Sequence, residues 1–127
     1  MMQRINPIGC YDPTPNAYSH AVRVGNVLHI SGQGGENVYG ELSLNFAKQT
    51  KQAIQNLITI LNTQNASLEH IAMLRVLVKD HCAEKHAILI EIFKQHWQTF
   101  PACTLIPVPT LALEKMQIEI EATAYLP

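Results

Sequence analysis

The sequence is short of charge. Only 15% of its 127 residues are Asp, Glu, Lys or Arg, against about 25% in an average globular protein. The nine basic residues are scattered and the formal net charge is −1, so the chain lacks the basic stripe that binds a phosphate backbone. We therefore expect no nucleic-acid partner, and we expect a copy of the chain to cover part of the surface.

Paired cysteines and long apolar segments are also missing. The three cysteines cannot all pair and none has CxxC spacing (Cys10, Cys82 and Cys103), which favours a reducing compartment. No apolar run approaches the roughly 18 residues that cross a bilayer, and the stretch MMQRINPIGCYDPTP has no apolar segment typical of a secretion signal. These absences predict a cytoplasmic protein with no membrane partner.

Motifs for metals, phosphates and nucleophilic catalysis are weak or absent. His81 and His86 are spaced too widely to share one helix face, and beyond Cys82 no further ligand lies nearby. The glycine-rich stretch 32–41 lacks the GK[ST] ending of a P-loop. Ser19 and His20 are neighbours in an extended segment, so their side chains point to opposite faces. We expect no metal and no cofactor.

What the chain does have is enough apolar residues for a core, at 47% of the sequence. A chain of this length buries roughly two thirds of its unfolded surface, so residues 1–127 are expected to form a single domain. Alternating stretches on both sides of Gly25-Asn26 predict a β-hairpin. Residues 115–126 also alternate, and 71–80 has the apolar, partly β-branched composition of a strand buried on much of both faces.

Helical periodicity occurs twice. An apolar stripe predicts a helix over about 44–64 with Ser43 as its N-cap, and a second helix is predicted over about 82–97. Pro107 and Pro109 place the extended stretch 103–111 at a sheet edge or in a distorted segment. This order of elements predicts an α+β fold with a mixed sheet and both helices on one face.

Three candidate functional groups stay open on the residues alone. Glu119 and Glu121 share one strand face about 7 Å apart, as either a solvated surface or a general acid or base. His29 lies on the same face as Ser31, which favours a hydrogen-bonded structural histidine. Cys103 has no adjacent cation, histidine or helix N-terminus, which favours a buried, inert thiol over a nucleophile.

Several segments in order resemble the RidA family of small imine and enamine deaminases. They are NAYSHAVRVGNVLHISGQ (16–33), the glycine-rich loop to Gly40-Glu41, VLVKD (76–80), FPACTLIPV (100–108) and IEIEATA (118–124). The resemblance covers nearly the whole chain. It implies a chorismate-mutase-like sheet of about six strands with two helices on one face, and a homotrimer with a barrel-like core and a small-molecule pocket at each subunit interface.

The resemblance also implies roles for particular residues. It assigns Tyr18 and Glu121 to catalysis, with the carboxylate positioning the attacking water. Substrate-binding positions follow the same correspondence (Ser31, Gly32, His86, Cys103 and Thr104). In active members of the family an arginine in the Phe-Pro-Ala-Arg segment grips the carboxylate of a 2-imino acid, a bidentate contact that suits a guanidinium.

Cys103 stands where the resemblance predicts that arginine, and His86 stands where family members often carry an asparagine. A lost bidentate grip lowers carboxylate affinity by roughly two orders of magnitude or more. The sequence therefore leaves two functions open: a hydrolase acting on the C=N bond of a small imine, or a non-catalytic trimer that binds or senses a metabolite. Thiol chemistry at Cys103 is a third hypothesis.

Overall fold

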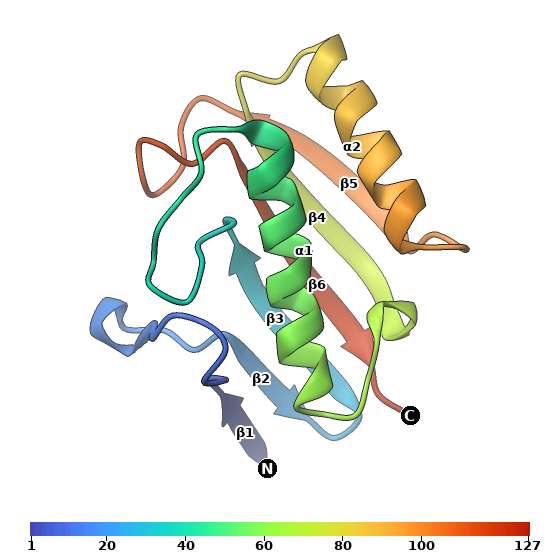
Figure 1. Cartoon of the computed structure of the whole chain (residues 1–127). Coiled ribbons are helices and arrows are strands. Elements are labelled where there is room, and N and C mark those ends of the chain that lie inside the picture. Colours follow the sequence, from blue (N-terminus) through green and yellow to red (C-terminus); the bar gives the residue numbers. More distant parts are fainter.

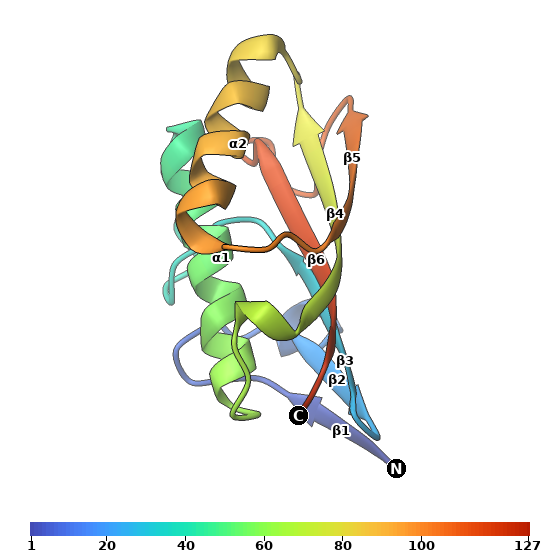
Figure 2. The same ribbon diagram turned by 90° about the vertical axis from the view of Figure 1, so that its right-hand side faces the viewer.

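The computed structural model describes residues 1–127 as a six-stranded mixed sheet with two helices on one face (Figures 1 and 2). The strand order across the sheet is β1-β2-β3-β6-β4-β5. The parallel pair is β4 with β5, and the other neighbours run antiparallel. The elements are β1 (Met2–Ile5), β2 (Ala21–Val24), β3 (Val27–Gln33), α1 (Phe46–Asn62), β4 (Ile71–Lys79), α2 (Ala83–His96), β5 (Ala102–Val108) and β6 (Ile118–Tyr125), with 3-10 turns at Thr14–Asn16 and Leu68–His70.

Most predicted elements are confirmed. The hairpin turns at Gly25, whose φ of +60 lies in the left-handed region that favours glycine. Strand β5 lies at the edge of the sheet and pairs with β4 alone, as its prolines predict. The α+β class, with both helices covering one face of the sheet, is visible in Figure 2. Neither helix is long and apolar enough to cross a membrane.

Two local predictions were wrong, and one strand was missed. The first helix is capped by Asn45, whose side chain accepts a hydrogen bond from the Lys48 backbone N–H. The Ser43 hydroxyl, two residues earlier, accepts from the Asn45 N–H. Strand β6 begins at Ile118 and not at 115. Strand β1 was not predicted, because four residues with one buried side chain carry no readable alternation.

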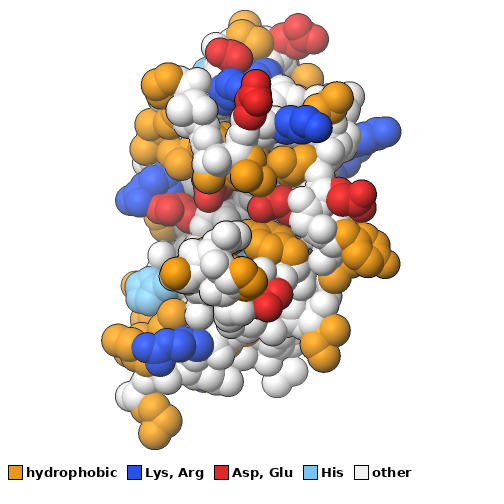
Figure 3. All heavy atoms as spheres, turned by 90° about the vertical axis from the view of Figure 1, so that its left-hand side faces the viewer, with side chains coloured by type: hydrophobic (Ala, Val, Ile, Leu, Met, Phe, Trp, Pro, Cys, Tyr) orange, Lys and Arg blue, Asp and Glu red, His pale blue; other side chains and the backbone are white.

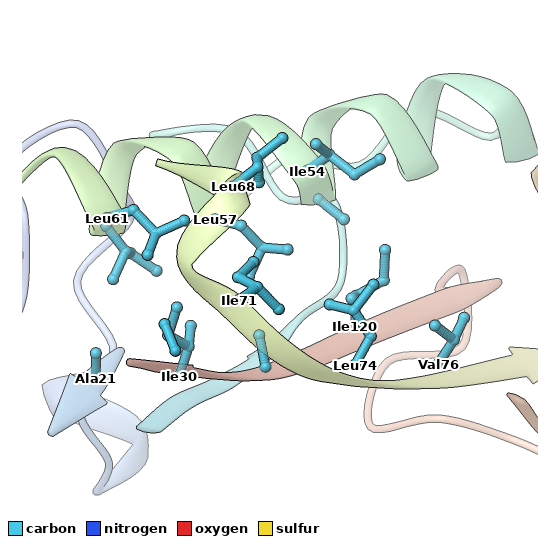
Figure 4. Packing of buried hydrophobic residues seen from close by; sticks show 14 of the residues in the cluster. Ala21, Ile30, Ile54, Leu57, Leu61, Leu68, Ile71, Leu74, Val76 and Ile120 are labelled. Atoms are coloured by element: carbon cyan, nitrogen blue, oxygen red, sulfur yellow. The ribbon is translucent and has the colours of Figure 1, made fainter. Parts of the chain in front are cut away.

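The core lies between α1 and the sheet (Figure 4). Leu57 and Ile54 of α1 are fully buried and face Leu74 of β4 and Ile120 of β6, which are also fully buried. At about 25 cal/mol per Å² of buried apolar surface, each such side chain stabilises the fold by roughly 1.5–3 kcal/mol. Because every second side chain of β6 is buried in this core, the side chains between them lie on the opposite face of the sheet.

The opposite face of the sheet is open in the single chain. Strand β4 buries only the side chains that face the helices, so the prediction of burial on much of both faces was wrong for one chain. Arg75 on the open face is half-exposed and forms an ion pair with Glu121 of β6, its register partner. This face carries both candidate carboxylates.

Candidate functional site

A buried histidine, His20, directly precedes β2 and hydrogen-bonds to two neighbouring segments. His20 is fully buried, and its Nε2 lies 2.7 Å from the Tyr11 carbonyl oxygen, which can only accept. Nε2 therefore carries the proton, and Nδ1 accepts from the Gln33 side-chain amide at 3.2 Å. His20, not His29, is the structural histidine. The prediction for His29 was wrong, since its side chain is exposed and makes no hydrogen bond within the chain.

Two tyrosines are fixed against His20. The Tyr11 and Tyr18 hydroxyl groups hydrogen-bond to each other, and the Tyr11 ring meets the His20 ring edge-on with centroids 4.7 Å apart. Burial raises the pKa of both phenols, so both tyrosines stay protonated at neutral pH. Tyr18 is thereby held as a neutral hydrogen-bonding group.

The end of β3 makes room for a carboxylate. The register with β6 shifts between Ile30 and Gln33, and Ser31 in this bulge donates its hydroxyl proton to the Ser19 carbonyl at 2.7 Å. A Cβ atom on Gly32 would lie 2.1 Å from Glu119 Oε1. Only glycine at position 32 therefore lets Glu119 occupy this place.

Glu119 lies in the hollow that Tyr18, Ser31 and Gly32 line. Burial, and then the charges of Glu36 and Glu121, raise the pKa of the Glu119 carboxyl. A raised pKa brings a carboxylate closer to the range in which it exchanges protons with a reacting group. In the view of Figure 3, acidic side chains lie along a hollowed band on the face that carries the loops before β2 and α1.

Glu121 lies in a neighbouring hollow, which shares Ser31 and includes Arg75 and His29. The two carboxylates have different neighbours because of the register between β6 and β4. Glu121 lies opposite Arg75 of β4, whereas Glu119 lies opposite Leu77. The role of Glu121 stays a prediction. The geometry brings Glu119 to the predicted residues Tyr18, Ser31 and Gly32.

The remaining predicted site residues lie on β5, at the other edge of the sheet, and on α2. Cys103 of β5 pairs with Leu74 and borders an apolar groove with Phe93 and Phe100. Thr104 is the register partner of Arg75, and His86 lies on the exposed surface of α2. None of the three residues lines the hollow of Tyr18.

Cys103 is exposed in the single chain, so the expectation of a buried thiol was wrong. Partial burial still raises the pKa of this thiol. At neutral pH it is protonated and neutral, which does not favour a thiolate nucleophile.

Sequence reasoning missed two titratable residues of the Tyr18 hollow, Tyr11 and Glu36. Tyr11 lies in a proline-rich loop that has no periodicity. Glu36 lies among the glycines of 32–41, and its burial, which is unusual for a glutamate, cannot be read from the sequence.

Comparison with solved structures assigns the fold to the chorismate-mutase-like type. RidA from an Antarctic Psychrobacter bacterium matches with a TM-score of 0.90 and 29% identity, covering 98% of this chain and 99% of that one. Among curated proteins, Protein HMF1 of Saccharomyces cerevisiae is 30% identical over 98% of this chain and 97% of its own. The 2-iminobutanoate/2-iminopropanoate deaminase of Escherichia coli K12 is 33% identical over 84% of this chain and 85% of its own.

The family model described as "Endoribonuclease L-PSP" matches residues 12–126. The chain belongs to this family, the RidA family. The match includes every helix and strand after β1, and it leaves out residues 1–11, of which Tyr11 lines the hollow.

Proposed function

We propose that this protein hydrolyses the C=N bond of a small imine, or of an enamine after its conversion to the imine. The observation that carries the proposal is the position of Glu119, whose carboxylate lies against Gly32 in the hollow of Tyr18 and Ser31. The printed names of relatives, 2-iminobutanoate/2-iminopropanoate deaminases, support the same reaction class.

In the proposed reaction, Glu119 accepts a proton from water as the water oxygen adds to the imine carbon, and Glu119 then passes that proton to the nitrogen. The resulting aminoalcohol then collapses to a carbonyl compound and ammonia, so that one imine and one water are consumed. A carboxylate with a raised pKa suits this proton transfer. Ser31 donates its own proton to Ser19, which leaves its oxygen free to accept an N–H from the ligand.

The proposed site is completed by a second subunit of a homotrimer. His86, Cys103 and Thr104 lie away from the Tyr18 hollow in one chain, which is what a pocket between two copies requires. The open sheet face and the low content of charged residues favour burial of that face in the trimer core. The three free cysteines are consistent with the proposed cytoplasmic location.

The substrate proposed here lacks the carboxylate of a 2-imino acid. Cys103 is neutral, and Arg75 is already paired with Glu121. Arg4 lines a separate hollow that shares Tyr18 and Ser31; it is the remaining candidate for an anion contact.

The test is ammonia release from two imines of similar size. An amino-acid oxidase generates 2-iminobutanoate, and an amine oxidase generates the carboxylate-free imine of n-butylamine. We expect the protein to accelerate hydrolysis of the second imine at least tenfold more than that of the first. Failure to accelerate either imine, with correctly assembled protein, rejects the hydrolase.

A non-catalytic metabolite-binding trimer is the second candidate function, favoured by the neutral thiol at position 103. A bound ligand raises the melting temperature whether or not it reacts. Stabilisation by a metabolite without turnover of either imine supports this function, and its absence across neutral, anionic and cationic metabolites counts against it.

A further inference from the structure

Glu36 is a buried carboxylate that the Tyr11 hydroxyl approaches but that the fold leaves partly unsatisfied. Its side chain is 8% exposed, and Oε1 is buried without a hydrogen-bond partner. Leaving a buried carboxylate unpaired is strongly unfavourable unless a proton, a cation or a ligand donor meets it. Because Glu36 lines the hollow of Tyr18 and Glu119, what meets it there is expected to be a ligand.

The loop holds Glu36 rigidly in this position. The Asn56 side-chain amide of α1 donates to the Glu36 carbonyl oxygen at 2.9 Å. The preceding Gly35 has φ +85, and a Cβ atom there would lie 2.5 Å from the Gln49 carbonyl oxygen. The loop is therefore packed directly on the α1 backbone, and these contacts fix the Glu36 backbone beside the hollow.

Within one chain, the hollow has two carboxylates and no basic side chain in its lining. Glu36 and Glu119 both border it, together with the rings of Tyr11 and Tyr18. The charge of Glu36 reaches Glu119, since it is one of the causes that raise the pKa of the Glu119 carboxyl. Carboxylates with aromatic rings are the groups that recognise organic cations.

We propose that Glu36 and Glu119 bind the positively charged nitrogen of an organic ligand, an amidinium or a protonated imine, between the two tyrosines. Planar cations of this kind offer several N–H donors, which match the unpartnered Oε1 of Glu36. A metal ion is not favoured, because no group of three or more His, Cys, Asp or Glu side chains is placed to hold one. This inference rests on the proposed site of hydrolysis and reverses the charge of its ligand relative to a 2-imino acid.

The test compares propanamidinium with propanoate, which have the same shape and opposite charge. Binding of propanamidinium chloride and sodium propanoate to the whole protein is measured by NMR titration at pH 7.5 and low salt. We expect propanamidinium to bind at least tenfold more tightly than propanoate. Glu36→Gln is expected to weaken propanamidinium binding at least tenfold, while Glu91→Gln, the same change on an exposed residue of α2, leaves it unchanged.

Three results overturn the proposal: no propanamidinium binding up to tens of millimolar, a preference below tenfold, or a smaller loss in Glu36→Gln. Propanoate binding that Arg4→Gln abolishes points instead to an anion site. If Glu36→Gln does not fold, Glu119→Gln must show the tenfold loss, because Glu119 is half-buried and its replacement leaves the loop intact.

The binding test and the hydrolysis test can fail independently of each other. Propanamidinium binding without imine turnover rejects the reaction and leaves the cation pocket. Imine turnover without the amidinium preference rejects the cation pocket and leaves the reaction.

Discussion

Gly32 is the residue at which one added methyl group meets the proposed catalytic carboxylate. In Gly32→Ala the new Cβ takes the place of Glu119 Oε1, from which it would be 2.1 Å. Because the Glu119 side chain can swing away, we expect a loss of activity and not of the fold: imine hydrolysis falls by at least tenfold while the melting temperature changes by no more than about 2 °C.

The control for Gly32→Ala is Gly9→Ala, whose Cβ meets Thr59 Cγ2 at 3.0 Å away from the hollow. Unchanged hydrolysis in Gly32→Ala, measured as ammonia release beside this control, contradicts the placement of Glu119.

Glu119 also gives the activity a definite pH dependence. The groups that face its carboxyl are Glu36, Tyr18 and Glu121, the last of which is paired with Arg75. Activity is expected to rise with pH as Glu119 ionises, because the carboxylate is the proposed base. Glu36→Gln removes a neighbouring negative charge that raises the pKa of Glu119, so it is expected to move this rise to lower pH. A pH–rate profile that stays in place argues against contact between the two carboxylates.

The raised pKa of the Glu119 carboxyl makes its contribution to stability fall as pH rises, whereas the activity is expected to rise. A carboxyl whose pKa is raised by folding favours the folded state below its unfolded pKa, and this contribution is lost as pH rises through the folded pKa. Glu119→Gln is therefore expected to raise the free energy of unfolding at pH 7 relative to the natural protein, and to change it less at pH 4. Urea unfolding at both pH values measures this.

Spacing in the sequence could place Glu119 and Glu121 on one strand face, and it did. The spacing could not show which of the two carboxylates lies beside Tyr18, because that depends on the register of β6 against β4 and on the bulge in β3. These are contacts between residues more than 40 positions apart. Glu36 was out of reach for a related reason: its burial arises from the packing of Gly35 on α1.

At the scale of elements, the start of α1 distinguishes two possible caps. Asn45 is the N-cap in the structure, and its side chain satisfies the Lys48 N–H. We expect Asn45→Ala to lower the free energy of unfolding by about 1 kcal/mol, and Ser43→Ala to lower it less. Urea unfolding of the two variants checks the assignment, and the reverse order contradicts it.

Periodic elements were predictable and short ones were not. The alternation in β6 and the apolar stripe of α1 are sustained over several turns of the pattern and decide the α+β class. The four-residue β1 is held by its register with β2 and has no pattern of its own. Ser43 and Asn45 are both good cap residues two positions apart, so the sequence alone could not place the first turn.

At the scale of the whole molecule, the open sheet face is the proposed trimer interface. Ile106 of β5 is 37% exposed and is the register partner of Leu77 on this face. We expect sedimentation to give about three times the mass of one chain, and Ile106→Glu to shift the protein toward monomer. Ile8→Glu introduces the same charge on a loop residue that is 98% exposed and is expected to leave the trimer intact. A monomeric natural protein contradicts the shared site.

The central claim is that Glu119, and not Glu121, is the base of an imine hydrolase. The most direct measurement is the initial rate of ammonia release from the n-butylamine-derived imine for Glu119→Gln and Glu121→Gln side by side. We expect Glu119→Gln to lose at least a hundredfold and Glu121→Gln to lose less than tenfold. A loss confined to Glu121→Gln, or equal rates in both variants and the natural protein, contradicts the account.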